Sequence, residues 1–187
     1  MSIGRLRQVT TARTAILAIL LVSLTFCRKR ETLTTSLEAG NKVAPRTVRL
    51  FYESADLLLF PEMRNLQLPE NPAGALPIVV RELLKGPASA GVPRLFPADT
   101  VVRGAFLLPD GTALVDLGGE TVTRGWSTGS HHELMAVYSV VFTVTTNFPT
   151  ARRVRLLLNG EPAETLGGHV SLDKPLVPMA ALTAGAR

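Results

Sequence analysis

Cysteine is almost absent from this chain: Cys27 is the single one among 187 residues. One cysteine cannot form an intramolecular disulfide, so the folded part must be stabilised by its apolar core. An apolar content of 46% and a charged content of 19% are typical of a globular protein, and the length suits one domain. Cys27 directly follows an apolar segment, which argues against a catalytic thiol.

Aromatic residues and clustered basic residues are also scarce. The chain has one tryptophan and two tyrosines, and its net charge of +5 is unevenly distributed. Arg5, Arg7 and Arg13 precede Cys27, so the remainder carries 20 − 3 = 17 basic residues against 15 acidic ones. Nucleic-acid binding usually needs a basic patch with stacking aromatics. We therefore expect no nucleic-acid partner.

No familiar catalytic, phosphate-binding or metal-binding motif occurs. The three histidines are His131, His132 and His169. Adjacent residues on a helix point about 100° apart, so His131 and His132 are poorly placed to share one ion. Gly167 and Gly168 do not open a helix, as a phosphate-binding loop would require. The sequence therefore predicts no catalytic set, no metal and no cofactor.

The N-terminus indicates export. Three arginines precede the uncharged segment 14–26, which is too short for a spanning helix of about 20 residues but typical of a secretory signal. Leu24 and Thr25 before Cys27 resemble a bacterial lipobox, in which the cysteine receives the lipid. Residues 1–27 are thus a lipoprotein signal, a retained membrane anchor or a cleaved secretory signal, and each places the domain outside the cytoplasm.

The tether and the first hairpin follow this signal. Residues 28–46 are predicted to form a flexible tether, because 31–46 is polar and lacks a hydrophobic period. The alternation of 47–52 predicts a strand, and 56–68 is expected to pair with it as a hairpin. Pro61 should keep the second strand at a sheet edge.

The segment 71–87 predicts the first helix. Asn71 is a good N-cap, Pro72 suits the first helical position and Gly86 a C-terminal stop. Pro77 predicts that the regular helix begins late.

A second helix is expected from Ser130 to just before Pro149. Ser130 with Glu133 three residues later matches a capping box, and apolar residues follow at steps of three and four. Its many β-branched residues are weak helix formers, so burial must stabilise it.

Two turn signals complete the pattern. Pro109-Asp110-Gly111 divides the hairpin 101–117, and Asn159-Gly160 divides two further strands within 152–170. The order β(β)–α–β–β–α–β(β) predicts an α/β fold of the α+β sandwich type. We expect a small mixed β-sheet with two helices on one face.

The chain resembles a GerMN domain in five stretches that follow one another in a fixed order. They are VRLFY, ELLKGP, FPADTVVRGAFLLPDGTALVDL, GSHHELMAVYSVVFTVTTNFPTARRVRLLLNG and TLGGHVSLDKPL. The family is named for the sporulation and spore germination protein GerM. The resemblance covers 47–178 and leaves 179–187 as a tail. It implies a unit similar to ring-building motif domains, often found in exported lipoproteins, that acts in the assembly of envelope complexes and not in catalysis. This chain has one such domain, whereas GerM has two.

The resulting hypothesis is a non-enzymatic, membrane-tethered binding or assembly module of the bacterial envelope. Its partner would be an envelope protein complex or peptidoglycan, with Cys27 as the candidate lipid attachment site and homo-oligomerisation open. The alternative is a protein that binds or hydrolyses cell-wall material, with His132 and His169 converging. We interpret Gly167, Gly168 and His169 as a contact or structural loop that turns the chain back over the sheet.

Overall fold

Strands and helices alternate along residues 42–183, which the computed structural model describes apart from Gly125 and Ser127. In chain order the elements are β1 (Val43–Glu53), β2 (Leu59–Pro69), α2 (Pro72–Leu84), β3 (Val101–Leu107), β4 (Thr112–Gly118), α3 (Glu120–Thr123), α4 (Ser130–Asn147), β5 (Arg153–Leu158), β6 (Glu161–Pro162) and the 3₁₀ helix η1 (Ala180–Leu182). All of them belong to one compact unit that begins at Val43. The expected signal, Cys27 and the tether up to residue 41 lie outside the described residues.

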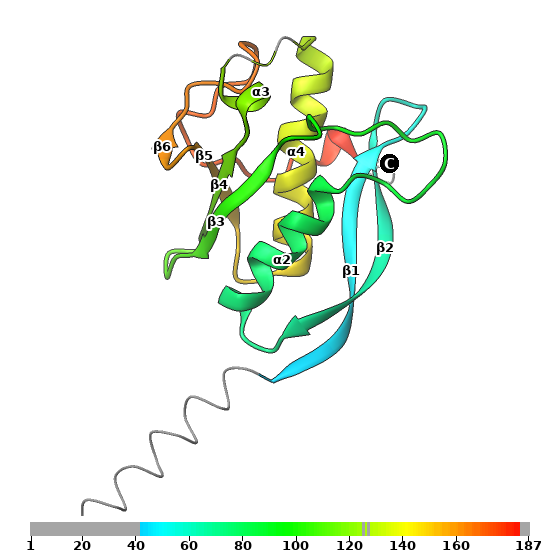
Figure 1. Ribbon diagram of the computed structural model, residues 1–187, viewed down its shortest axis with the longest axis vertical. Helices are drawn as coiled ribbons and strands as arrows, with labels where there is room; N and C mark the ends of the chain where they lie inside the picture. The colour runs from blue at the N-terminus through cyan, green and yellow to red at the C-terminus, as the bar shows by residue number, and fades with distance from the viewer. Residues whose placement is uncertain (1–41, 125, 127, 184–187) are drawn as a thin grey trace, which may run out of the picture. The chain divides into compact units, whose positions relative to one another are not determined.

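The strands form two sheets, with α2 and α4 packed between them (Figure 1). β3, β4, β5 and β6 form a mixed sheet, in which β3–β4 and β5–β6 are antiparallel and β4–β5 is parallel. This confirms the predicted α+β class and the mixed sheet. The first hairpin differs from the simple sandwich, because β1 and β2 form a separate two-stranded sheet.

α4 is buried on nearly every side because it contacts both sheets. It packs against β1 on one side and β5 on the other. Consecutive residues from Met135 to Val144 are buried, including the polar Ser139 and Thr143. The helix ends at Asn147, before Pro149, as predicted. Burial on two sides explains how a helix rich in β-branched residues is stable.

The first hairpin is longer than its sequence pattern predicts. β1 begins at Val43, inside the polar segment that the sequence predicts as part of the tether. Val43 pairs with Pro69 at the far end of β2. The strand therefore starts four residues before the predicted position 47, because pairing with β2 and not burial orders its first residues. Pro61 lies in β2, which pairs with β1 alone among the described strands, so its edge position is confirmed.

α2 begins at Pro72, and the predicted late start is wrong. The Asn71 side chain accepts a hydrogen bond of 2.6 Å from the Gly74 backbone N–H, which confirms the N-cap. Pro77 is accommodated inside the helix, where it removes the one N–H that would bond to Ala73. The cap and the buried apolar face of α2 compensate for this lost bond.

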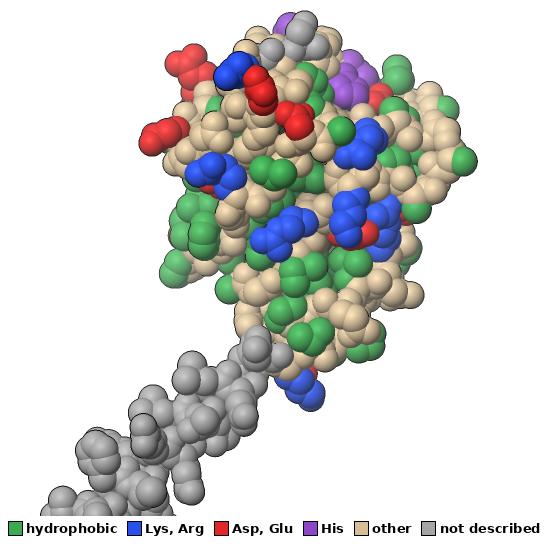
Figure 2. Space-filling view, in the orientation of Figure 1, with side chains coloured by type: hydrophobic (Ala, Val, Ile, Leu, Met, Phe, Trp, Pro, Cys, Tyr) green, Lys and Arg blue, Asp and Glu red, His purple; other side chains and the backbone are tan. Residues whose placement is uncertain are grey.

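Both predicted turns are present. Gly111 has φ +81° in the β3–β4 turn, and Asn159 and Gly160 have φ +53° and +85° before β6. On the face that carries α2 and β3, acidic and basic side chains are interspersed, as a mixed surface charge requires (Figure 2). No helix in the described part of the chain has the length and apolar character that a membrane span needs.

Candidate functional site

The N-terminal end of α4 carries most of the residues singled out in the sequence. Gly129 is the N-cap, with an extended backbone, and no side chain caps the helix. Ser130 lies in the first turn, so the predicted capping box is wrong. The Glu133 backbone N–H bonds to the Gly129 carbonyl, and its side chain turns to another part of the chain.

Glu133 holds the loop that contains Gly167 and His169. Its side chain is fully buried, and Oε1 accepts hydrogen bonds of 2.9 Å from the backbone N–H groups of Leu166 and Gly167. Oε2 accepts one of 2.8 Å from the backbone N–H of His169. Three donors around one carboxylate satisfy the charge that burial would otherwise destabilise. Glu133 is therefore the anchor of this loop.

The two glycines of the loop serve different purposes. A Cβ on Gly167 would lie 2.8 Å from Thr128 Cγ2 and 2.9 Å from the Trp126 carbonyl oxygen, so no side chain fits there. Gly168 has open space around it but a φ of +96°, and its N–H donates to Thr165 Oγ1 over 3.0 Å. Close approach and left-handed backbone thus explain the glycine pair.

The three histidine rings turn to three different partners. His131 Nε2 lies 2.7 Å from the buried carboxylate of Glu53 at the end of β1. The His132 ring stands at 79° to Trp126, with 5.4 Å between centroids. His169 Nε2 lies 3.0 Å from the Thr128 carbonyl oxygen, in the segment that precedes α4, and so bonds outside its own turn. No group of three or more metal-binding side chains occurs among the described residues.

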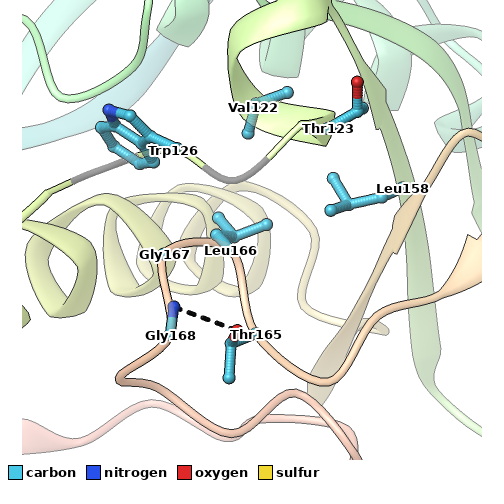
Figure 3. A pocket seen from close by; sticks show the side chains of 8 residues that line it. All are labelled: Val122, Thr123, Trp126, Leu158, Thr165, Leu166, Gly167 and Gly168. Atoms are coloured by element: carbon cyan, nitrogen blue, oxygen red, sulfur yellow. Dashed lines mark hydrogen bonds between the residues drawn. The ribbon is translucent and has the colours of Figure 1, made fainter.

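A pocket of about 380 Å³ opens beside this loop (Figure 3). It is lined by Val122, Thr123, Trp126, Leu158, Thr165, Leu166, Gly167 and Gly168. Thr123 Oγ1 donates to the Gly119 carbonyl over 2.6 Å, and Trp126 stacks on Phe96 at 6.0 Å between centroids. No charged side chain lines the pocket, so it suits an apolar group more than proton transfer.

Sequence patterns gave only part of this site. They indicated the glycine pair and His169, but not α3 or the wall formed by Val122, Trp126 and Leu158. α3 is too short to show a helical period. One signal was available: Glu133 lies four residues before Val137 on the buried face of α4, where an ionised side chain needs partners.

A second polar cluster is structural and lies between the first hairpin and the end of α2. Arg64 donates to Glu62 and Glu82 over 2.7 Å each, and to the Gly86 carbonyl. Burial alone would raise the pKa of Glu62, but hydrogen bonds from the Ala88 backbone, from Arg64 and from Ser89 lower it to about 2. For Tyr52 the effect of burial prevails and raises the pKa of its hydroxyl, which donates a hydrogen bond to the Gly86 carbonyl.

Comparison with known proteins places this fold in one family. A family model described as "Germane: Sporulation and spore germination" matches residues 50–164, more than half of the chain. No curated protein matches the sequence significantly.

Solved structures agree with the family match. A Clostridium perfringens structure described as a candidate lipoprotein aligns at TM-score 0.51 and 15% identity, over 72% of this chain and 87% of that one. The tandem GerMN domains of the sporulation protein GerM from Bacillus subtilis align at TM-score 0.52 and 19% identity, over 76% of this chain and 48% of that one. The first GerMN domain of GerM by itself aligns at TM-score 0.45 and 25% identity, over 71% of this chain and 97% of that one. The first two likenesses show a shared fold.

Proposed function

Because the chain belongs to the Germane family of sporulation and spore germination domains, we propose that it is a non-enzymatic binding module that assembles with an envelope protein. The pocket beside Gly167 carries this proposal. Its lining is mostly apolar and free of charged side chains, and a loop that Glu133 fixes in place borders it. A preformed pocket of this kind loses little entropy on binding.

The polar groups around the pocket support binding over catalysis. The Glu133 carboxylate accepts three backbone N–H groups, and His169 Nε2 is hydrogen-bonded to the Thr128 carbonyl. His132 packs on Trp126 instead of approaching His169 with a shared ligand. The hydrolase hypothesis needed these two rings to act together, and their separate partners give it no support.

A protein side chain suits this pocket better than a sugar ring. A glycan platform needs an open aromatic face, whereas one face of Trp126 is stacked on Phe96 and its ring also meets the His132 ring edge to face. Val122, Leu158 and Leu166 add aliphatic walls. We therefore propose an apolar side chain of an envelope protein as the occupant, and peptidoglycan binding becomes an outcome of the test.

We also propose that the module is tethered to the membrane through Cys27 and faces the extracytoplasmic space. The basic N-terminus, the apolar segment 14–26 and the lipobox-like residues support this. A similarly folded Clostridium perfringens structure described as a candidate lipoprotein agrees with it. Mass spectrometry of the membrane-extracted N-terminus should show a diacylglycerol-modified Cys27. An unmodified cysteine behind an intact N-terminus would show a retained anchor instead.

Site-specific photo-cross-linking in the native host tests the binding function. A photoreactive residue at Thr123 or Thr165, on the pocket wall, should yield an adduct with a defined envelope protein. The same residue at Met63, which is 57% exposed on β2, serves as the control and should not yield it. Adducts with glycan strands would replace the protein partner by peptidoglycan, adducts with the chain itself would indicate a homo-oligomer, and no pocket-specific adduct would overturn the proposal.

A further inference from the structure

A second pocket, which we call the α2–β3 pocket, lies between the last turn of α2 and the start of β3. Arg81, Leu84, Thr100, Val101 and Val102 line its volume of about 270 Å³. It shares no residue with the pocket beside Gly167. Its size suits one or two side chains, because pockets for drug-sized ligands are about 300–1,000 Å³.

Thr100 lines this pocket and has a hydroxyl that is closed to solvent and lacks a partner. The residue is 7% exposed, and its Oγ1 has no hydrogen bond to any described residue. Its backbone is fixed, since its N–H donates to the Pro97 carbonyl over 3.1 Å. Gly119, at φ +128°, also packs against it, because a Cβ there would lie 3.1 Å from Thr100 Cα. A hydroxyl in this state gains free energy from any acceptor that reaches it.

Arg81 adds an available cation. Its side chain is exposed and makes no hydrogen bond or ion pair with the described residues, and it lies in the last turn of α2. Arg94 adds a second guanidinium at this helix end, where it donates to the Leu84 carbonyl over 2.9 Å. Basic side chains are visible over the α2 and β3 region (Figure 2).

The acidic groups of this region are already paired. Glu82 binds Arg64 and Lys85 over 2.7 Å each. Asp99 Oδ2 accepts the Thr121 backbone N–H over 2.8 Å, and Asp116 pairs with Arg103 over 3.3 Å. No described acid therefore neutralises Arg81, and the pocket is complementary to an incoming anion.

We infer that the α2–β3 pocket binds the carboxylate of an acidic segment of a partner protein. Arg81 forms the ion pair, and Leu84, Val101 and Val102 contact the aliphatic stem. A rotation of the Thr100 side chain about its Cα–Cβ bond brings its unpaired hydroxyl to a carboxylate oxygen. A carboxylate fits better than a phosphate, because one guanidinium and one hydroxyl match its two oxygens and the walls are apolar.

The open rim favours a protein segment over a small molecule. Val101 is 53% exposed beside the pocket, and Phe106 is 60% exposed further along β3. β3 is the outer strand of its sheet and pairs only with β4 among the described strands. An extended segment would cover these apolar residues while its acid enters the pocket. This inference goes beyond the proposed function, because it concerns a separate surface. Either proposal can be wrong while the other holds.

NMR titration of the full chain in detergent micelles tests the inference. The probe is the capped peptide acetyl-Ala-Val-Glu-Leu-Ala-amide, compared with the same peptide carrying Gln in place of Glu. We expect saturable shifts at Thr100, Val101 and Val102 with the Glu peptide, and at least about tenfold weaker binding of the Gln peptide.

Variants separate binding from folding. R81Q should weaken binding of the Glu peptide about tenfold, and T100V should weaken it about threefold. Neither variant should lower the thermal midpoint, because neither side chain has an internal partner to lose. R124Q is the matched control, since Arg124 pairs with Glu120 on α3, and it should leave binding unchanged. Equal binding of the two peptides, an unaffected R81Q, or no saturable shift would overturn the inference. Butyrate binding as tightly as the peptide would replace the protein segment by a small carboxylate.

Discussion

Glu133 in the first turn of α4 accepts a hydrogen bond from the backbone N–H of His169, 36 residues later in the chain. With the bonds from Leu166 and Gly167, this contact fixes the loop onto the helix. E133Q removes the charge and places an amide N–H₂ among backbone donors. We expect the free energy of unfolding to fall by about 2–4 kcal/mol. Denaturant titration followed by the fluorescence of Trp126, the single tryptophan, measures this change.

H169A is the control for that variant. The ring of His169 makes one exposed hydrogen bond, to the Thr128 carbonyl, whereas its backbone N–H stays in place. The cost should therefore be below about 1 kcal/mol. If H169A destabilised the domain as much as E133Q, the carboxylate would not be the anchor of the loop.

Gly167 and Gly168 should respond differently to alanine. G167A brings a Cβ within 2.8–2.9 Å of Thr128 and of the Trp126 backbone, so we expect a loss of about 2–3 kcal/mol. G168A meets open space and pays only for its positive φ, about 1 kcal/mol. Thermal unfolding of the two variants side by side measures the difference, and equal losses would argue against the close packing at Gly167.

Stability should depend on pH through Glu62. Its pKa falls from 4.5 to about 2 on folding, so the folded state binds its proton less readily than the unfolded chain. The stabilisation is present above about pH 4.5 and disappears as the pH falls towards 2. We expect E62Q to lose about 2 kcal/mol at pH 7 and to show a weaker pH dependence between pH 5 and pH 2. Unfolding titrations at several pH values test this, with E161Q on the exposed strand β6 as the control that should match the parent chain.

Thr143 joins α4 to the separate first sheet. Its buried Oγ1 accepts the backbone N–H of Phe51 over 3.0 Å, and Asn147 one turn later bonds to both backbone groups of Arg49. T143V leaves the Phe51 N–H unsatisfied and should cost about 1–3 kcal/mol. T145V is the matched control, because Thr145 bonds only to the Val141 carbonyl of its own helix. Similar free energies of unfolding for both variants would contradict this role of Thr143.

Local chemistry explains which parts of the fold could be predicted. Asn71 caps α2, Gly111 and Gly160 turn the hairpins, and the apolar steps after residue 133 end before Pro149. Each signal acts within a few residues, so sequence neighbours suffice to predict it. The separate first sheet depends on contacts such as Thr143 to Phe51, which are 92 residues apart.

The candidate site likewise combines features that follow from local sequence with features that depend on distant contacts. The glycine pair, the single cysteine behind an apolar segment and the lack of a familiar catalytic motif can all be recognised in the chain before it folds. The role of Glu133 depends on long-range packing, because a carboxylate that could cap its own helix instead meets three N–H donors from a loop over 30 residues away. The same holds for Arg81 and Thr100, whose lack of partners is visible only once α2 and β3 lie side by side. Capping and turn formation are local, whereas satisfying a buried charge or leaving a hydroxyl unpaired depends on which distant segments the core brings together.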